Sequence, residues 1–479
     1  MLFSLLREAA TAAPRSGLRY RGTFTSYPDL ADRAERLAAG LLDRGIGPGT
    51  PVALLVPNSP DLFVAAYALF AIGAIAVPLN PASTARELEV AATKTGVAAV
   101  VVADEHVAIA EQLIAGLGRR FPMIRTSEYG TIMLAPQALP PVAPDTAAIY
   151  LFSSGSTGRP KVVPHTHAEM IAEGNAAGTG VGLLPDDVVL NSLPGHHGFG
   201  FMTVHFEAVA RGATTAFWSE PGPFMLTRGR FLAALAAERI TVLPAVPFVF
   251  ESLCGLTDDV DLTPLRRVYT GGVSLKRPLY DRFHERFGKR IGQAYGATEF
   301  GQISFSDGGD LATRDSVGPV TPGTSVELVD GELLVKSTQL TTGYLGGDAA
   351  SNAAFRDGGF LTGDLGRIDD EGNLYITGRS KLILEVAGMK VDPIEVEDVF
   401  LGHPAVAEAV VVGVPDPRSG EQRLKLVAVL RETAGQEDLI RYGRERLTAY
   451  KAPAIVEFID AIPRSATGKI LRGKLIGAG

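Results

Sequence analysis

The first part of the chain alternates between short apolar runs and segments whose apolar residues recur at helical spacing. Helical spacing is found over Tyr27–Asp43, Thr84–Thr95 and Ala108–Gly116. The runs Val52–Val56 and Val97–Ala103 are apolar throughout, which is typical of strands that are buried on both faces. Because strands that alternate with helices pair mostly in parallel, this pattern predicts an α/β architecture.

The uncharged stretch Leu62–Leu79 has the length of a transmembrane candidate, but a change of pattern divides it. Asp61–Ile72 is rich in alanine and favours a helix, and Gly73 is suited to end that helix. The following Ala74–Leu79 is typical of a short buried strand. The N-terminal residues also lack the basic and apolar regions of a secretory signal. We therefore expect a cytoplasmic protein with no membrane insertion.

The alternation resumes in the middle of the chain and later gives way to two other patterns. The middle part predicts helices at Phe231–Glu238 and Phe248–Leu253 and strands at Ile240–Leu243 and Arg267–Tyr269. From Gly318 onward, short strand-like segments with glycine turns follow at Ser325–Val329, Glu332–Val335 and Asn373–Ile376. The C-terminal part predicts helices at Pro393–Leu401 and Glu437–Leu447 and strands at Val406–Val414, Leu424–Leu430 and Ile455–Phe458. These patterns indicate a small β subdomain followed by a separate α+β domain.

Length and composition agree with more than one domain and exclude several classes of function. The chain has 479 residues, more than a single hydrophobic core usually supports, and we place a large N-terminal domain at 1–378 and a small C-terminal one at 382–479. A net charge of −8 argues against a nucleic-acid binder. The single cysteine, Cys254, excludes an intramolecular disulfide and a multi-cysteine metal site.

The first segment with evident chemistry is Ser153–Lys161, which reads SSGSTGRPK and follows the apolar run Ala147–Phe152. Glycines let backbone N–H groups approach a ligand, and the hydroxyls and Lys161 add donors and positive charge, a combination that suits a polyphosphate. The spacing of a Walker A loop is missing. A plain Gly/Ser connection is the alternative, and segments further along the chain decide between the two.

Four such segments follow in order. Gln293–Glu299 (QAYGATE) places an aromatic ring that can stack on a purine next to a carboxylate that can hold Mg²⁺. In Thr362–Gly366 (TGDLG), Asp364 can accept hydrogen bonds from both hydroxyls of a ribose. The last two segments are Gly378–Lys381 (GRSK) and Pro463–Lys469 (PRSATGK).

With these motifs in this order, the sequence resembles the adenylate-forming superfamily, which comprises acyl- and aryl-CoA synthetases, nonribosomal adenylation domains and luciferases. The resemblance covers nearly the whole chain and is nearest to acyl-CoA synthetases and 4-coumarate-CoA-ligase-like enzymes. It implies a large domain of mixed parallel sheets flanked by helices, a hinge at 379–381, and a mobile C-terminal domain.

The resemblance assigns an ATP site and an acid pocket to numbered positions. The implied ATP-binding residues are Ser153, Ser154, Gly155, Ser156, Thr157, Gly158, Lys161, Gly271, Gly272, Tyr295, Gly296, Ala297, Asp364 and Arg379. The segment Asn191–Gly200 (NSLPGHHGFG) and the glycine-rich strand at Thr270–Val273 (TGGV) imply a pocket. Its residues would be His197, Phe199, Val246, Gly271 and Val273. Adjacent histidines rarely share one metal ion, so we expect His197 to line the pocket and His196 to be structural.

The implied reaction joins a carboxylic acid to AMP and then to a thiol. Lys469 would stabilise the charge that develops when the acid attacks the α-phosphate of ATP, Thr298 would contact that phosphate, and Glu299 would bind Mg²⁺. His197 would lie beside the acid carboxylate. Lys381 would be the pivot about which the C-terminal domain turns to present the acceptor-thiol face at Gly388.

Two departures from the family pattern concern the acceptor. Val162 follows Lys161 where CoA ligases usually have glycine, which is similar to some aryl-acid-activating members. Glu385 stands near Gly388 where many relatives carry lysine, a residue that would favour a phosphorylated acceptor. We expect an acid:CoA ligase, acting as a monomer or homodimer. The alternatives are an enzyme that loads the phosphopantetheine of an acyl carrier protein, one that adenylates another oxyacid in secondary metabolism, and a binding module without catalysis.

Overall fold

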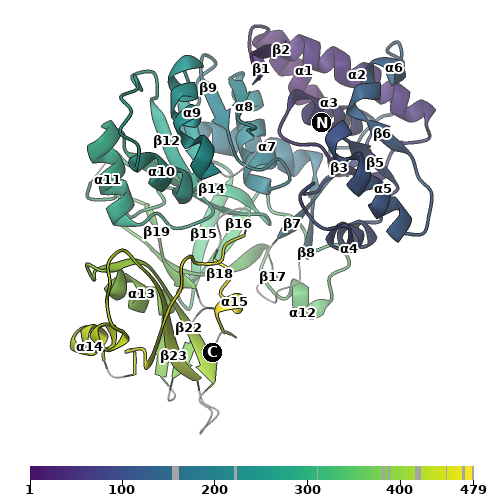
Figure 1. Ribbon diagram of the computed structural model, residues 1–479. Coiled ribbons are helices and arrows are strands. Elements are labelled where there is room, and N and C mark those ends of the chain that lie inside the picture. Colours follow the sequence, from purple (N-terminus) through teal and green to yellow (C-terminus); the bar gives the residue numbers. More distant parts are fainter. Residues whose placement is uncertain are drawn as a thin grey trace. The chain divides into compact units, whose positions relative to one another are not determined.

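The computed structural model describes residues 1–153, 161–220, 224–309, 311–379, 382, 384–386, 389–415, 422–448, 450–465 and 470–476. The chain forms two compact units (Figure 1). The first unit comprises Met1–Glu327, Leu334–Leu361 and Ile368–Tyr375. The second comprises Leu328–Leu333, Thr362–Arg367 and Ile376–Gly479. The chain therefore enters the second unit twice for a few residues before its C-terminal part stays there.

A six-stranded sheet occupies one half of the first unit. Its order is β6 (Met123–Arg125), β5 (Ala99–Val102), β3 (Pro51–Leu55), β4 (Ile75–Pro78), β7 (Ala147–Ser153) and β8 (Lys161–Thr166). All neighbours pair in parallel except β7 and β8, which are antiparallel. The helices that accompany it are α1 (Leu2–Ala12), α2 (Tyr27–Asp43), α3 (Pro60–Ala71), α4 (Ala85–Thr95), α5 (Val107–Gly116) and α6 (Tyr129–Ile132).

Side chains that alternate along these strands divide the helices between the two faces of the sheet. Ala53 and Leu55 face a core shared with α4 and α5, whereas Val52 and Leu54 face a core shared with α1, α2 and α3. Every residue of α3 except Asp61 is buried. This explains the uncharged stretch Leu62–Leu79, which is an interior helix followed by the buried strand β4, as predicted, with Gly73 at φ +68° between them.

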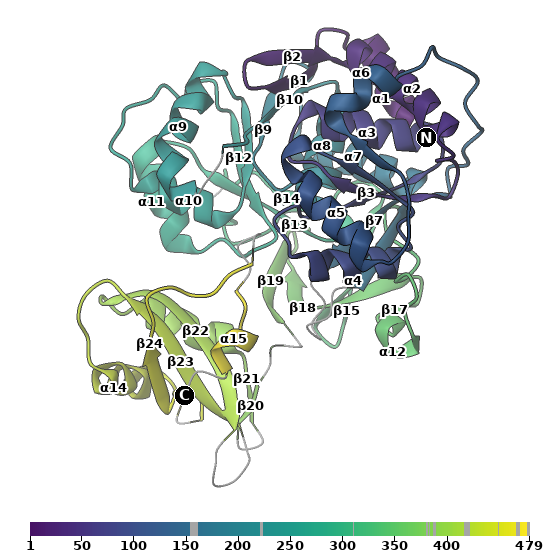
Figure 2. The ribbon, with the colours of Figure 1, turned by 45° about the vertical axis from the view of Figure 1, so that its right-hand side comes forward.

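An eight-stranded sheet occupies the other half of the first unit. Its order is β14 (Gly301–Ser306), β13 (Ile291–Ala297), β12 (Arg267–Gly271), β11 (Val242–Ala245), β9 (Val188–Asn191), β10 (Thr214–Phe217), β1 (Gly17–Tyr20) and β2 (Thr23–Ser26). The helices beside it are α7 (His167–Val181), α8 (His205–Arg211), α9 (Phe224–Ala237), α10 (Pro247–Cys254) and α11 (Arg277–Phe287). The last three lie together on one side of this sheet, as Figure 2 shows.

A third sheet is formed by strands that follow the eight-stranded sheet along the chain. It contains β15 (Thr324–Val329), β16 (Glu332–Ser337), β17 (Phe355–Arg356), β18 (Gly359–Ile368) and β19 (Leu374–Arg379), and the short helix α12 spans Ala349–Asn352. The second unit adds the hairpin β20 (Leu384–Val386) and β21 (Met389–Val391) and the sheet β22 (Val406–Pro415), β23 (Gln422–Leu430) and β24 (Ile455–Phe458). Its helices are α13 (Pro393–Leu401), α14 (Gln436–Arg446) and α15 (Gly473–Ile476).

The observed fold confirms the predicted class, with mixed sheets flanked by helices and a small C-terminal α+β domain. One boundary differs clearly, because α9 begins at Phe224 and not at Phe231. Arg228, Gly229 and Arg230 hide the helical pattern, yet the rings of Phe224 and Phe231 pack edge to face at 5.2 Å and extend the buried side of the helix. The N-terminal helix α1 was not predicted.

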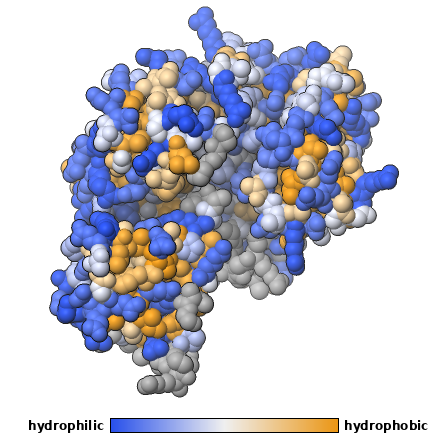
Figure 3. Space-filling view, viewed as in Figure 1, coloured by the Kyte–Doolittle hydropathy of each residue, from blue (hydrophilic) through white to orange (hydrophobic). Residues whose placement is uncertain are grey.

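The described part of the chain contains no helix long and apolar enough to cross a membrane. Figure 3 shows polar and apolar side chains interspersed over the visible surface. The exposed large apolar side chains include Leu226, which is 78% exposed, and Met225 and Phe248, both 45% exposed.

Candidate active site

The two strands that flank the predicted phosphate loop are joined by antiparallel pairing in which Ser153 lies opposite Lys161. The intervening residues 154–160 lie outside the described residues. Ser153 is 8% exposed, and its hydroxyl has no hydrogen-bond partner within the described part of the chain. Buried polar atoms normally have partners, so this hydroxyl has a hydrogen bond to offer to a ligand or to the loop that follows it.

The predicted purine and Mg²⁺ segment forms the end of β13 and the turn into β14. A β-bulge separates Tyr295 from Gly296 and changes the register of the two strands. A Cβ atom on Gly296 would lie 2.2 Å from the carbonyl oxygen of Gly301, so only glycine permits this close approach of the strands. The bulge leaves Tyr295 partly exposed and brings the chain to Glu299, which is 8% exposed.

The backbone of this turn is bound from two sides. The imidazole Nε2 of His165, in the strand that leaves the phosphate loop, lies 2.7 Å from the carbonyl oxygen of Thr298. The backbone N–H of Thr341 donates to the carbonyl oxygen of Glu299 at 2.9 Å. The turn is therefore attached directly to β8, and the structure brings together the phosphate-loop strand and the predicted Thr298-Glu299 pair.

A buried carboxylate fixes the first residues of β14. Glu173 of α7 is 1% exposed, and both of its oxygens accept from the backbone N–H of Gln302 at 3.0 Å. It also accepts from the hydroxyl of Thr203 at 2.7 Å. Burial raises the pKa of Glu173 to about 7. The sequence analysis missed this residue, although a carboxylate on the buried side of an otherwise apolar helix is a signal that could have identified it.

A second buried acid lies beneath the acid pocket. Glu207 of α8 is fully buried, and its carboxylate accepts from the hydroxyl of Tyr269 at 2.6 Å. Burial, and to a lesser extent the negative charge of Glu173, raises the pKa of Glu207 to about 8. The ring of Tyr269 lies 6.3 Å, centroid to centroid, from that of Phe199. Glu207 is thus linked through Tyr269 to Phe199, one of the residues predicted to line the acid pocket.

Phe199, which is predicted to line the acid pocket, is the first residue of a π-helix at Phe199–Val204. A Cβ atom on Gly271 would lie 3.1 Å from the tip of the Phe199 ring, so the glycine allows the ring to lie against β12. The backbone N–H of Phe199 donates to Nδ1 of His197 at 3.2 Å, which orients the imidazole. Val246 caps the N-terminus of α10 and packs in the same core cluster as Phe199.

Other predicted pocket residues differ in burial and backbone geometry. Gly272 has φ +77° and is exposed, and Val273 beside it is half-buried. Burial, and to a lesser extent the charge of the neighbouring His197, lowers the pKa of His196 to about 4. A neutral, largely buried His196 agrees with the structural role expected for it.

The predicted ribose-binding pair lies in the second unit. Asp364 is 5% exposed, and Nε of Arg379 lies 2.6 Å from its Oδ1 atom. The positive φ of Gly363, +78°, sets the turn before Asp364, and its N–H donates to Glu332 at 2.6 Å. Arg379 thus orients the carboxylate that would accept the ribose hydroxyls.

Three other predicted positions, Lys469, the hinge residue Lys381 and the thiol-face residue Gly388, lie outside the described residues. Their roles stay predictions.

The sequence analysis also missed Tyr344. Its hydroxyl donates to Oε1 of Glu299 at 2.8 Å, and the ammonium of Lys161 lies 4.3 Å from the centroid of its ring. Burial, together with the negative charge of Glu299, raises the pKa of Tyr344 above its ordinary value, so the phenol remains a hydrogen-bond donor. One tyrosine thus contacts both charged residues predicted to handle the triphosphate.

Within the described residues no group of three or more histidine, cysteine, aspartate or glutamate side chains could enclose a metal ion. Mg²⁺ on a nucleotide does not need such a group, since one or two carboxylates and the phosphate oxygens usually suffice. Oε1 of Glu299 accepts from Tyr344, and a carboxylate has further lone pairs to offer. The donor set around Glu299 therefore fits a nucleotide-bound Mg²⁺ ion.

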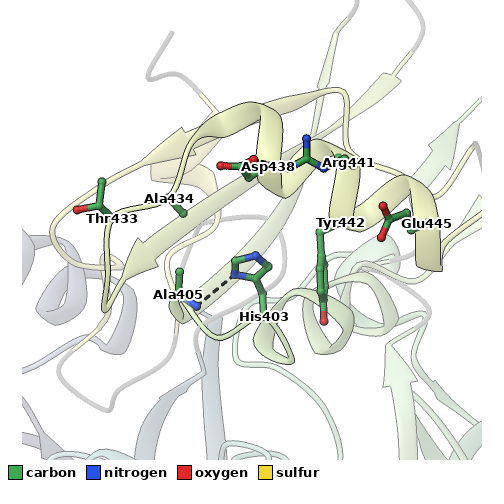
Figure 4. Close-up of a pocket in the computed structure, with 8 residues that line it drawn as sticks. All are labelled: His403, Ala405, Thr433, Ala434, Asp438, Arg441, Tyr442 and Glu445. Atoms are coloured by element: carbon green, nitrogen blue, oxygen red, sulfur yellow. Dashed lines mark hydrogen bonds and ion pairs between the residues drawn. The ribbon is translucent and has the colours of Figure 1, made fainter.

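A separate cavity of about 290 Å³ lies in the second unit and contains none of the predicted residues (Figure 4). His403 accepts from the N–H of Ala405 at 3.2 Å and packs edge to face on Tyr442 at 4.7 Å. Arg441 at its rim is paired with Asp438 at 2.5 Å. Several of its polar groups are therefore already paired within the protein.

Comparison with known proteins finds relatives that match nearly the whole chain. Residues 6–345 match the AMP-binding enzyme family, and residues 395–469 match the AMP-binding enzyme C-terminal domain. A feruloyl-CoA synthase from an Amycolatopsis species is 30% identical over 98% of this chain and 97% of its own length. The 4-coumarate–CoA ligase-like protein 5 of Oryza sativa subsp. japonica is 33% identical over 99% of this chain and 89% of its own.

Solved structures of CoA synthetases and related enzymes have the same fold as this chain. ATP-bound MatB from Rhodopseudomonas palustris superposes with a TM-score of 0.90 at 25% identity, over 99% of this chain and 98% of that chain. The o-succinylbenzoate CoA synthetase MenE of Bacillus subtilis, in complex with its acyl-adenylate, gives a TM-score of 0.88 at 26% identity over 99% and 98%. The chain therefore belongs to the AMP-binding enzyme family.

Proposed function

We propose that this protein is an ATP-dependent, AMP-forming ligase that joins a carboxylic acid to coenzyme A. The observation that carries the proposal is the attachment of the Thr298-Glu299 turn to β8 through His165, at 2.7 Å. This contact supports the proposal because it attaches the turn that carries Thr298, predicted to contact the α-phosphate, and Glu299, predicted to bind Mg²⁺, to the strand that follows the phosphate loop. Full-length relatives named as CoA ligases support the same reaction.

The reaction has two steps whose atoms balance. In the first, a carboxylate oxygen of the acid forms a bond to the α-phosphorus of ATP, and the bond from that phosphorus to the bridging oxygen breaks, releasing pyrophosphate. In the second, the sulfur of the CoA thiolate forms a bond to the acyl carbon, and AMP leaves with the oxygen that came from the acid. Activation is needed because a free carboxylate has no good leaving group.

The residues divide this work by their position. Lys161 and the loop before it would bind the β- and γ-phosphates, and Thr298 would donate to the α-phosphate. Mg²⁺ bound at Glu299 would neutralise phosphate charge. Asp364, oriented by Arg379, would hold the ribose. Lys469 would stabilise the charge that builds up between acid and phosphorus.

The acid pocket favours an apolar acyl group. Phe199, Val246 and Gly271 supply apolar surface, and His197 is the polar group beside them. We propose an aromatic or medium-chain acid, and a feruloyl-CoA synthase and a coumarate ligase-like protein among the relatives support the aromatic choice.

The thiol acceptor is free CoA in this proposal, since the relatives are named for CoA products and not for carrier proteins. The C-terminal domain would turn about Lys381 after adenylation to present the face at Gly388. The hinge stays a prediction from sequence.

A pyrophosphate-release screen tests the proposal. The purified chain is incubated with ATP, Mg²⁺ and a panel of aromatic, medium-chain and other acids, and the products with CoA or a holo-carrier protein are identified by mass spectrometry. We expect an acyl-CoA from at least one acid, and no product from a Lys469→Ala variant. Thioester formed only on the carrier protein would overturn the assignment of CoA as the acceptor. If none of the acids in the panel caused pyrophosphate release, the assignment of ligase activity would be wrong.

A further inference from the structure

The segment Thr341–Leu345 (TTGYL), which we name the strap, contacts both the negatively charged Glu299 and the positively charged Lys161. It was not recognised as a motif in the sequence. All of its contacts described below lie within the first unit. They reach β8 on one side and the Glu299 turn on the other.

The backbone of the strap is fixed at both ends. The hydroxyl of Thr341 donates to the carbonyl oxygen of Pro164 at 2.5 Å, and the N–H of Leu345 donates to the carbonyl oxygen of Val162 at 3.0 Å. The N–H of Thr341 donates to Glu299, as described above. The strap therefore runs along β8 directly after the phosphate loop and cannot move independently of that strand.

The side chain of Tyr344 is held in turn by the rest of the first unit. The backbone N–H of Tyr344 donates to Oδ1 of Asn352 at 3.0 Å, and the Tyr344 ring packs edge to face on Phe355 at 5.3 Å. Held in this way, the phenol is rigid and half-buried. A rigid hydroxyl at 2.8 Å from Oε1 selects one orientation of the Glu299 carboxylate, and the π face of the ring attracts the Lys161 ammonium at 4.3 Å.

We propose that Tyr344 is a positioning residue that holds the Glu299 carboxylate and the Lys161 ammonium at a fixed separation suited to a magnesium triphosphate. The inference rests on the proposed function, because it takes Glu299 as the metal-binding carboxylate and Lys161 as a phosphate-binding cation. The hydroxyl of Tyr344 acts on the metal-binding Glu299, and the ring of Tyr344 acts on the phosphate-binding Lys161. The two effects are separable by substitution.

Two substitutions of Tyr344 and one matched control separate these effects. Tyr344→Phe keeps the ring and removes only the hydroxyl, whereas Tyr344→Leu removes both. Tyr375→Phe is the control, since the hydroxyl of Tyr375 also donates to a carboxylate, Asp369, at 3.1 Å, but elsewhere in the first unit. Calorimetric binding of ATP is measured with and without Mg²⁺, and pyrophosphate release is measured over a range of Mg²⁺ concentrations.

For Tyr344→Phe we expect the Mg²⁺ concentration for half-maximal rate to rise about tenfold, with metal-free ATP binding unchanged, because outer hydrogen bonds tune metal affinity by about 10- to 100-fold. For Tyr344→Leu we expect metal-free ATP binding to weaken as well, by about threefold, because the cation–π contact is lost. The control should match the wild type in both measurements. A general loss of structure would lower all affinities together and would not produce this separation.

If Tyr344→Phe showed the same Mg²⁺ dependence of rate and the same Mg·ATP binding as the wild type, the inference would be wrong. Should Tyr344→Leu fail to fold, the isosteric Tyr344→Phe variant alone decides the question. Glu299→Gln distinguishes the two levels of the argument. If Glu299→Gln retains the full effect of Mg²⁺ on ATP binding, the metal role in the proposed function is wrong and the inference falls with it. If it loses that effect and Tyr344→Phe does not, the inference alone is wrong.

Discussion

The buried carboxyl of Glu207 makes the stability of this enzyme depend on pH in an unusual direction. Its pKa is about 8 in the folded protein, raised by burial, against about 4.5 when exposed to water. The folded state therefore keeps a proton that the unfolded state releases, and stability falls as pH rises from about 4.5 to about 8. Glu207→Gln places a neutral amide in the same space, still able to accept from Tyr269, and removes this titration.

The magnitude follows from the interval over which the two states differ. Each pH unit within it costs about 1.4 kcal/mol, so between pH 5.5 and pH 8 the wild type should lose about 3 kcal/mol relative to Glu207→Gln. The measurement is the free energy of unfolding of the first unit in urea at several pH values, followed by tryptophan fluorescence from Trp218. Glu207→Gln should be the more stable protein by about 1 kcal/mol at pH 5.5 and by about 4 kcal/mol at pH 8.

A matched control and a clear contrary outcome complete this test. Glu238 is a partly exposed carboxylate beside Arg19, at 3.7 Å, and Glu238→Gln should change the free energy of unfolding by less than about 1 kcal/mol at every pH. If the difference between wild type and Glu207→Gln stayed constant from pH 5.5 to pH 8, the proton assigned to the buried acid would not exist. The reasoning from burial would then be wrong.

Three further substitutions address the site itself. Lys469→Ala should lower the rate of adenylation by at least about 100-fold while thioester formation from a supplied acyl-adenylate continues, as measured by single-turnover assays of each step; equal loss in both would contradict the assignment. Asp364→Asn should raise the KM for ATP about tenfold, with little change in the KM for the acid, in pyrophosphate-exchange kinetics. Gly296→Ala should cost about 100-fold in adenylation, because its Cβ would lie 2.2 Å from the Gly301 carbonyl and displace the Glu299 turn; an active, folded variant would show that the bulge is not needed.

The sequence predicted the parts of the fold where one local signal decides the outcome. The helices Tyr27–Asp43 and Pro393–Leu401 and the strand Ile455–Phe458 were predicted with the boundaries that the structure shows. The first two begin at caps that can be read locally, since Ser26 and Asp392 each accept a hydrogen bond from the start of the helix. Strand order could not be predicted, because β1 pairs with β10 from nearly two hundred residues away.

The site divides along the same line. Motifs with several chemically distinctive residues, such as YGATE and TGDLG, could be identified because their residue types are rarely combined by chance. Glu207 and Tyr344 could not be, because each is a single polar residue in an ordinary segment and its partner is distant in sequence. Glu173 gave one local signal, its place on the buried side of a helix, but its partner Gln302 is also distant in sequence.

This division has a physical cause. Residues that touch a nucleotide must lie on adjacent loops and carry strong donors or charges, so their spacing is constrained and visible in the sequence. Residues that hold those loops in place need only one hydrogen bond of suitable geometry, and any element that passes nearby can supply it. In this chain His165 from β8 and Tyr344 from the strap bond the turn that carries Thr298 and Glu299, and Glu173 from α7 bonds Gln302 in the strand that follows the turn. The rigidity of the turn is therefore distributed over several elements, and loss of any one contact should weaken catalysis before it unfolds the protein.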